Sequence, residues 1–320
     1  MRFATLALLA LAALAGCSPP APKPSPKLAW AYPTGKPVAL PAPPAGPQHV
    51  PGSPLTLDLV AIEKAGALPD WFPDEHPAPP AIVAHAAAKG PTPCGECHLI
   101  AGVGFPGAAD LEGLPAAYII EQVKEFRAGR RRSAQADRLD TLEMIKVAQQ
   151  VSDADLAAAA AYYAALTRRA RHRVIETDTV PATRPSYFGW LDLVANGKPE
   201  PIAGRIIEVP EDTDRLFLSD PHLTIIDYAP FGSVVRGEKL VRTGGPGGQA
   251  CASCHGADLR GGDTAPPLAG RSAAYLARML WDFKTGARTG PAAAPMATPA
   301  GKLNEAQITD IVAYLAARAP

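Results

Sequence analysis

The two halves of this 320-residue chain carry the same pattern of residues at a nearly constant offset. Cys94 and Cys251 lie 157 positions apart, and the same offset relates Leu111 to Leu268, Ala117-Tyr118 to Ala274-Tyr275, Phe126 to Phe283, Gly129 to Gly286 and Arg131 to Arg288. Further along, an offset of 152 relates Met144 to Met296, Val151 to Leu303 and Tyr162 to Tyr314. Such a repeat predicts two copies of one folding unit.

Each copy contains a Cys-x-x-Cys-His pentapeptide: Cys94-Gly95-Glu96-Cys97-His98 and Cys251-Ala252-Ser253-Cys254-His255. This is the spacing by which haem c is attached, because two thiols meet the two vinyl groups of one porphyrin and the next residue directs an imidazole at the iron. One such pentapeptide is also compatible with a redox dithiol or half of a zinc site. Two of them predict two covalently attached haem c groups, with His98 and His255 as iron ligands.

The repeat also proposes the ligand on the opposite side of each iron. Met296 lies in Ala294-Pro295-Met296-Ala297-Thr298-Pro299, whose prolines predict an irregular loop and exclude a helix interior. It matches Met144 at the offset of 152. We therefore expect Met144 and Met296 to be the sixth ligands, although Met144 taken alone also fits a helical core residue.

The remaining methionine and histidines are weaker candidates. Met279 matches Gln122 and is expected to pack near the porphyrin edge. His85 is the substitute ligand for the first iron if Met144 is not one, with a surface or capping role as the alternative. The other histidines stand in proline-rich or polar connections and are expected to face solvent: His49, His76, His172 and His222.

The N-terminus has the features of an export signal with a lipid anchor. Met1-Arg2 and the apolar run from Phe3 to Ala15 match a short signal, and Leu14-Ala15-Gly16-Cys17 resembles the lipobox of bacterial lipoproteins. We expect residues 1–17 to be the lipoprotein signal and lipidation site, with Cys17 lipidated. The alternative is an ordinary signal with a chance cysteine. The predicted location is the periplasmic face of a bacterial membrane.

Composition separates an arm from the folded mass and excludes one class of partner. Of the 36 prolines, 20 lie between Pro19 and Pro93, which predicts an extended arm over residues 18–80. The 31 basic and 31 acidic residues leave no net charge. A chain that grips nucleic acid needs a basic surface, so no nucleic-acid partner is expected.

Helix signals recur in both copies. Gly129 and Gly286 end equivalent apolar stripes, and Ser152 and Asn304 open equivalent final helices with an acidic or amide residue three positions later. With the pentapeptides and matched methionines, these features resemble class I cytochromes c. The resemblance implies an all-α fold with two class I cytochrome c domains in tandem, at residues 81–170 and 233–320, and His/Met ligation of each iron.

Two features depart from that family's compact pattern. In the family, a backbone carbonyl near a Pro-Leu pair orients the proximal histidine; Pro267-Leu268 fits, whereas the first domain has Asp110-Leu111, which leaves its arrangement open. The connecting segment, residues 171–232, is long. Within it, residues 205–210 and 223–228 predict short β-strands.

Arg131 and Arg288 follow equivalent helix ends and have three possible roles. They could meet haem propionates, or the triplet Arg130-Arg131-Arg132 could dock an acidic redox partner. They could also be cations placed favourably at a helix C-terminus.

Full axial ligation of both irons favours an electron carrier over an enzyme, because neither iron then has an open position. The expected partners are redox proteins of the respiratory chain or a periplasmic dehydrogenase, with membrane attachment through Cys17. A di-haem peroxidase is the alternative if Met144 is not a ligand, and a haem subunit of a periplasmic dehydrogenase complex stays open. A thiosulfate-oxidising enzyme with a cysteine ligand is disfavoured, since no cysteine remains for that role.

Overall fold

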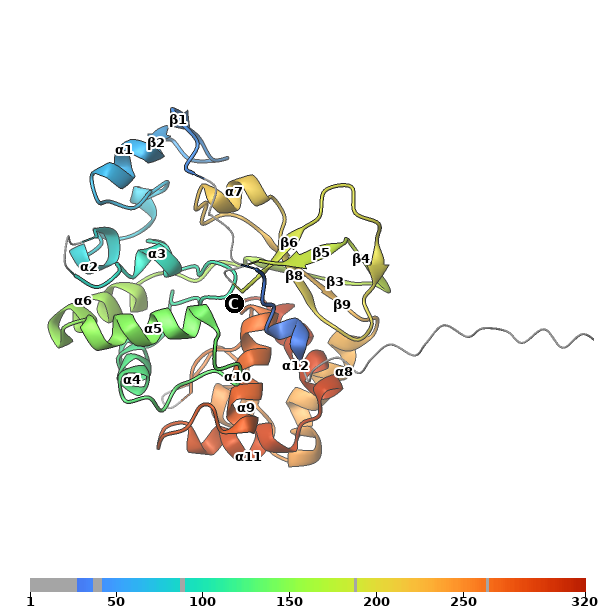
Figure 1. Ribbon diagram of the computed structural model, residues 1–320. Helices are drawn as coiled ribbons and strands as arrows, with labels where there is room; N and C mark the ends of the chain where they lie inside the picture. Colours follow the sequence, from blue (N-terminus) through green and yellow to red (C-terminus); the bar gives the residue numbers. More distant parts are fainter. Residues whose placement is uncertain (1–27, 37–41, 87–89, 187–188, 263–264) are drawn as a thin grey trace, which may run out of the picture.

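The computed structural model describes residues 28–36, 42–86, 90–186, 189–262 and 265–320. The expected signal and Cys17 lie outside the described residues. Within the described ranges, no helix combines the length and apolar character needed to cross a membrane. The chain forms two helical units joined by a segment that contains a small sheet (Figure 1).

The first unit is built around α4 and α6. Its helices are α2 (Ala81–Ala84), α3 (Gly95–His98), α4 (Ala116–Arg127), α5 (Leu139–Gln150) and α6 (Asp153–Ala164). α6 begins where the sequence predicts, because the Ser152 hydroxyl accepts a hydrogen bond from the Asp155 amide at 3.1 Å. α4 ends before Gly129, whose φ of 69° lies in the left-handed region that favours glycine. The core between these helices includes the buried Tyr163.

The second unit repeats this order of α-helices and adds the short 3-10 helix η3. They are α8 (Ser233–Thr243), η3 (Gly245–Gly247), α9 (Ala252–His255), α10 (Ala273–Thr285), α11 (Ala294–Lys302) and α12 (Glu305–Ala316). Asn304 and Gln307 form the predicted capping box at the start of α12, with both bonds at 2.9 Å. α8 crosses α12 at Gly237, where a Cβ atom would collide with the Asp310 carbonyl and with Cβ of Tyr314. Glycine therefore permits this close helix contact.

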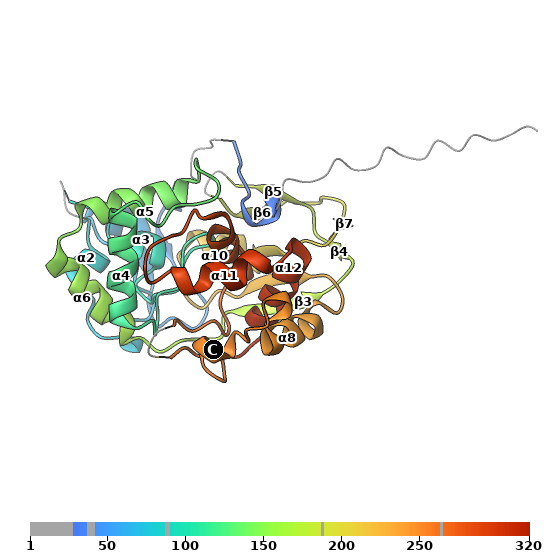
Figure 2. The same cartoon turned by 90° about the horizontal axis from the view of Figure 1, so that it is seen from below.

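The connecting segment folds into a β-rich unit. Its elements are β3 (His172–Glu176), β4 (Thr179–Val180), β5 (Thr183–Pro185), β6 (Leu191–Leu193), β7 (Glu200–Pro201), β8 (Ile207–Pro210), α7 (Thr213–Phe217) and β9 (Ile225–Ala229). β9 is the central strand of a three-stranded sheet, parallel to β3 and antiparallel to β8. The two predicted strands correspond to β8 and β9. In both views the sheet lies beside the second unit, away from α4–α6 (Figure 2).

The proline-rich segment is packed where it is described. Its elements are η1 (Ala29–Ala31), β1 (Pro47–Gln48), β2 (Leu57–Asp58), α1 (Leu59–Lys64) and η2 (Pro73–Glu75). Leu28, only 1% exposed, belongs to the core of the second unit, and the Tyr32 hydroxyl donates to Asp282 Oδ1 at 2.8 Å. Trp71 Nε1 donates to the Leu218 carbonyl of the connecting segment at 2.7 Å. This segment therefore contacts both the second unit and the connecting segment.

Candidate functional site

The two pentapeptides form equivalent single helical turns. α3 follows Cys94 and α9 follows Cys251, so each turn, with the cysteine before it, carries two thiols and an imidazole on five consecutive residues. Burial raises the pKa of Cys94 to about 12 and that of Cys97 to about 11. Neither thiol therefore has the lowered pKa that is typical of a redox dithiol.

The zinc alternative also lacks support within the described residues. There, the one group of three or more His, Cys, Asp or Glu side chains close enough to share a metal ion is His172, Glu208 and Asp227. It includes no residue of either pentapeptide. Two thiols with one adjacent imidazole remain the donor set of covalently attached haem, and that set fits at both positions.

Both pentapeptide histidines are held by the same backbone contact. His98 Nδ1 lies 2.7 Å from the Ala109 carbonyl oxygen, and His255 Nδ1 lies 2.8 Å from the Pro266 carbonyl oxygen. The two carbonyls are 157 positions apart, like the histidines. Each bond places the proton on Nδ1 and leaves Nε2 as the ligand atom. The carbonyl before Asp110-Leu111 therefore orients its histidine as the carbonyl before Pro267-Leu268 does.

Burial supports the neutral form of both imidazoles. It lowers the pKa of His98, against the opposing effect of the hydrogen bond that the imidazole donates to the Ala109 carbonyl, and it lowers the pKa of His255 in the same way. A neutral imidazole is the form that binds a metal ion. The side chains are therefore in the required protonation state at neutral pH.

The predicted sixth ligands lie on helices in both units. Met144 is half-buried in α5 and packs against the cluster of Val123, Ala148, Val151 and Leu156. Met296 lies in α11, so the loop expected from its neighbouring prolines is wrong. Pro295 occupies the first turn, where a missing amide hydrogen costs nothing. Ligation by Met144 and Met296 stays a prediction.

The secondary candidates are placed differently from one another. His85 ends α2 and is exposed. Met279 lies at the contact between the two units, where its sulfur lies 3.2 Å from Arg288 Nη1. His172, expected to face solvent, is buried on β3, with Nδ1 2.8 Å from Asp227 Oδ2. Only the β-sheet brings His172 beside Asp227, so no sequence signal indicated the pair.

Arg131 and Arg288 lie between the two units. Their side chains are buried, and their backbones form an isolated antiparallel bridge. Arg131 Nη2 donates to Tyr275 of the second unit at 2.9 Å, and Arg288 Nη2 donates to Tyr118 of the first at 3.1 Å. Both donate to Gln122 Oε1. Their burial excludes direct docking of an acidic partner protein at these two side chains.

This pair of guanidiniums has no carboxylate partner among the described residues within ion-pair distance. Arg131 Nε is buried without a hydrogen-bond partner. Burial by itself would raise the pKa of Tyr118. The guanidiniums of Arg288 and Arg131 outweigh burial and hold this pKa below its usual value. The contact between the units is therefore a positively charged, buried position that suits an anionic group.

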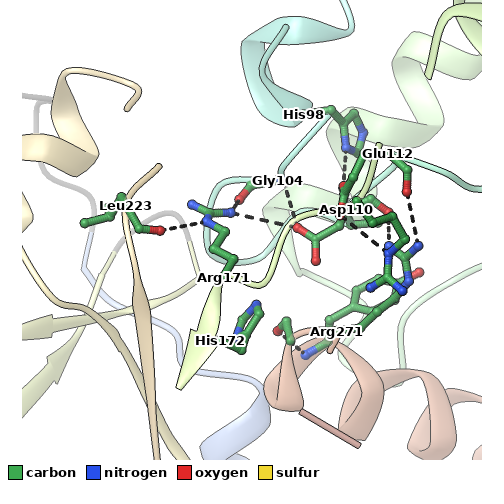
Figure 3. A network of polar contacts seen from close by, with 12 residues as sticks. His98, Gly104, Asp110, Glu112, Arg171, His172, Leu223 and Arg271 are labelled. Atoms are coloured by element: carbon green, nitrogen blue, oxygen red, sulfur yellow. Dashed lines mark hydrogen bonds and ion pairs between the residues drawn. The ribbon is translucent and has the colours of Figure 1, made fainter. Parts of the chain in front are cut away.

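A second charged network surrounds the loop that carries the Ala109 carbonyl (Figure 3). Asp110 Oδ1 lies 3.8 Å from Arg171 Nη1, and Arg271 Nη1 donates to the Asp110 carbonyl at 2.6 Å. Burial by itself would raise the pKa of Asp110. The nearby positive charges of His172, Arg171 and Arg271 outweigh burial and hold this pKa below its usual value. Burial, with the charge of Asp110, raises the pKa of Glu112 to about 8.

Comparison with known proteins agrees with this geometry. The family model described as Cytochrome c matches residues 234–318. Cytochrome c-554(548) of Halomonas halodenitrificans is 36% identical over 84 residues, which are 26% of this chain and 93% of that protein. The thiosulfate dehydrogenase electron acceptor of Thiomonas intermedia is 29% identical over 231 residues, 70% of this chain and 78% of that protein. Cytochrome c4 of Azotobacter vinelandii is 27% identical over 227 residues, 69% and 82% respectively.

Proposed function

This chain belongs to the cytochrome c family and has two covalent haem c sites, and on that premise we propose that it relays single electrons at the periplasmic face of a bacterial membrane. The haem groups supply the one-electron chemistry of iron. The chain supplies the ligands, the proton positions and the exclusion of water.

The equal support of His98 and His255 carries the proposal. His255 is buried and His98 is half-buried; each imidazole is held through Nδ1 by a backbone carbonyl and follows two thiols on the same turn. The di-haem peroxidase alternative needs one iron that opens for peroxide, and so a site that differs from the other. Two equivalent sites favour a relay.

The haem content of the purified protein tests this proposal. We expect two covalent haems per chain from the absorption of the alkaline pyridine derivative. Replacement of both thiols of one pentapeptide, Cys251→Ala with Cys254→Ala, should leave one haem per chain. One haem in the unaltered protein would contradict the proposal.

Met144 and Met296 are proposed as the sixth ligands. A thioether ligand raises the reduction potential and closes the open position of a five-coordinate iron. Added peroxide should therefore oxidise a reduced donor no faster than the background reaction. Rapid turnover would favour the peroxidase alternative and would exclude Met144 as a permanent ligand.

We propose that Arg131 and Arg288 bind the carboxylate groups of the haems. Their burial, the lack of an ion-paired carboxylate among the described residues and the unpartnered Arg131 Nε support this role. Guanidinium forks are well suited to carboxylates. Their positive charge would favour the ferrous state of both irons.

The electron donor is proposed to be a periplasmic dehydrogenase that oxidises thiosulfate. The Thiomonas relative, similar over most of both chains, is named as the electron acceptor of thiosulfate dehydrogenase. In a stopped-flow experiment, that dehydrogenase with thiosulfate should reduce both haems, and omission of thiosulfate should abolish the reduction. If dithionite reduces both haems and the dehydrogenase reduces neither, this donor is wrong while the carrier proposal stands.

Membrane attachment is proposed to depend on Cys17. Several acyl chains on one residue anchor a protein stably. Cys17→Ser should release the protein into the soluble fraction of the producing cells, with its haem content unchanged. Membrane association of that variant in high salt would contradict the lipid anchor.

A further inference from the structure

Arg271 joins two backbone loops that belong to different units. It lies between Pro267 and the start of α10 and is only 3% exposed. Nε donates to the Pro267 carbonyl at 3.1 Å, within its own unit. Nη1 donates to the Asp110 carbonyl at 2.6 Å, and Nη2 to the Glu112 carbonyl at 3.4 Å, both in the other unit.

The two carbonyls nearest to Arg271 are equivalent positions of the repeat. Asp110 and Pro267 are 157 residues apart, and each directly follows a carbonyl that accepts from a ligand histidine, Ala109 or Pro266. One guanidinium therefore contacts the same peptide position in both units. Arg271 itself has no repeat partner, since Leu114 occupies the equivalent position.

We propose that Arg271 is a positioning residue that sets the reduction potentials of both haems together by holding the two carbonyl loops in register. This inference rests on the proposed function, because it needs a haem at each histidine. The name proximal loops is used below for residues 102–112 and 259–269, which carry the two carbonyls.

The physical link is the strength of the bond at Nδ1. A strong Nδ1–H to carbonyl bond makes the imidazole a more basic ligand, which stabilises ferric iron and lowers the potential. The strength of that bond depends on where the Ala109 and Pro266 carbonyls lie. Since Arg271 holds the next carbonyl of each loop, its loss loosens both bonds at once.

Among the described arginines around the proximal loops, Arg271 is the one that hydrogen-bonds to both the Asp110 and the Pro267 carbonyl. Arg171 donates to the Gly104 and Leu223 carbonyls, which ties the first proximal loop to the connecting segment. Arg168 donates to the Ala269 carbonyl at 2.7 Å, at the end of the second loop, and its Nε lies 3.8 Å from the Glu112 carboxylate of the first loop, so it contacts side chain in one loop and backbone in the other. Within the part of the chain that the structure describes, neither Arg168 nor Arg171 donates to the Asp110 or the Pro267 carbonyl. The planar guanidinium of Arg271 has several donors in a fixed geometry, so it can donate to both carbonyls at once. The ammonium group of a lysine cannot reproduce that geometry.

Arg271→Lys keeps the buried positive charge and removes the fork. We expect the midpoint potentials of both haems to rise, and the shifted proton resonances of both ligand histidines in the ferric protein to move. Arg236→Lys is the matched control: Arg236 pairs with Asp310 at 2.8 Å in the second unit and contacts neither proximal loop. It should leave both potentials unchanged.

The outcomes separate this inference from the proposed function. A haem content other than two per chain in the unaltered protein would defeat the proposed function. Two haems per chain with a change at only one haem, or at neither, in Arg271→Lys would overturn the inference alone. A uniform fall of both potentials would also overturn it, because loosening of the Nδ1 bonds predicts a rise.

A measurement on the unaltered holoprotein covers the case in which the variant does not fold. The Leu111 amide donates to the Gly102 carbonyl at 2.7 Å and the Leu268 amide to the Leu259 carbonyl at 2.8 Å, at equivalent positions of the two proximal loops. If Arg271 fastens the loops, both amides exchange hydrogen through one opening with the same denaturant dependence. Different opening free energies for the two amides would contradict the inference.

Discussion

Arg131 and Arg288 make matching contacts across the boundary between the two units, each with a residue of the other unit. Each guanidinium carbon lies 4.4 Å from the centre of a phenylalanine ring of its own unit, and each Nη2 donates to the tyrosine of the other unit. The contact therefore has approximate two-fold symmetry, which follows from the sequence repeat. Gln122 and Met279 occupy equivalent positions, and both arginines contact both side chains; the symmetry is broken only because one offers an amide oxygen and the other a sulfur.

Arg131→Met should destabilise the contact between the units. It leaves the Tyr275 hydroxyl with one donor fewer and removes a cation–π contact, at a cost of about 1–3 kcal/mol. Denaturant unfolding of the haem-loaded protein measures this free energy. Arg132→Met is the control, because Arg132 is exposed and its loss should change stability by less than about 0.5 kcal/mol. Equal effects of the two variants would contradict the structural role of Arg131.

Met296→Ala and Met144→Ala should each remove one iron–sulfur bond. The weak long-wavelength band of ferric haem with methionine ligation should fall by about half in each variant, and the potential of the affected haem should drop. Met279→Leu is the control, since the Met279 sulfur contacts Arg288 at the interface. An unchanged band in Met296→Ala would remove Met296 from the ligand set.

His172 is expected to make the protein less stable as the pH becomes alkaline. Burial by itself would lower the pKa of His172 from 6.5. The carboxylates of Asp227, Glu208 and Asp110 outweigh burial and raise this pKa to about 9. The stabilisation from His172 is therefore complete below about pH 6.5 and is lost as the pH rises through about 9. Unfolding free energies between pH 6 and 10 measure this loss.

A variant isolates the contribution of His172 to that pH profile. His172→Gln should flatten the fall in stability between pH 6.5 and 9, because a neutral amide does not titrate. The exposed His49 provides the control, and His49→Gln should leave the slope as it is. The same slope in His172→Gln would assign the pH dependence to another group.

Gly237→Ala should weaken the crossing of α8 and α12. The added Cβ would overlap with the Asp310 carbonyl and with Tyr314, so the helices must separate, at a cost of about 1–3 kcal/mol. Thermal unfolding measures the change. Gly301→Ala in α11 is the control, because nothing lies within 4 Å of the added atom and alanine favours helix there. Gly301→Ala should be neutral or slightly stabilising, and a neutral Gly237→Ala would contradict the tight crossing.

The sequence predicted the parts of the fold that depend on local patterns. The two pentapeptides, the helix caps at Ser152 and Asn304 and the glycine stop at Gly129 follow rules that act over a few residues. The repeat extended these predictions from one unit to the other. The helix around Met296 was missed because Pro295 lies in the first turn, where proline is tolerated, and because α11 continues through Pro299, which local rules disfavour in a helix interior.

The sequence alone determined that two histidines and four thiols would form two equivalent haem sites, because covalent spacing and repetition are properties of the chain itself. The tertiary structure decided which backbone carbonyl holds each histidine, and it buried Arg131, Arg288, Arg271 and His172. These four residues act across units or strands, on partners up to 170 positions away. Their roles depend on desolvation and geometry, which only packing creates.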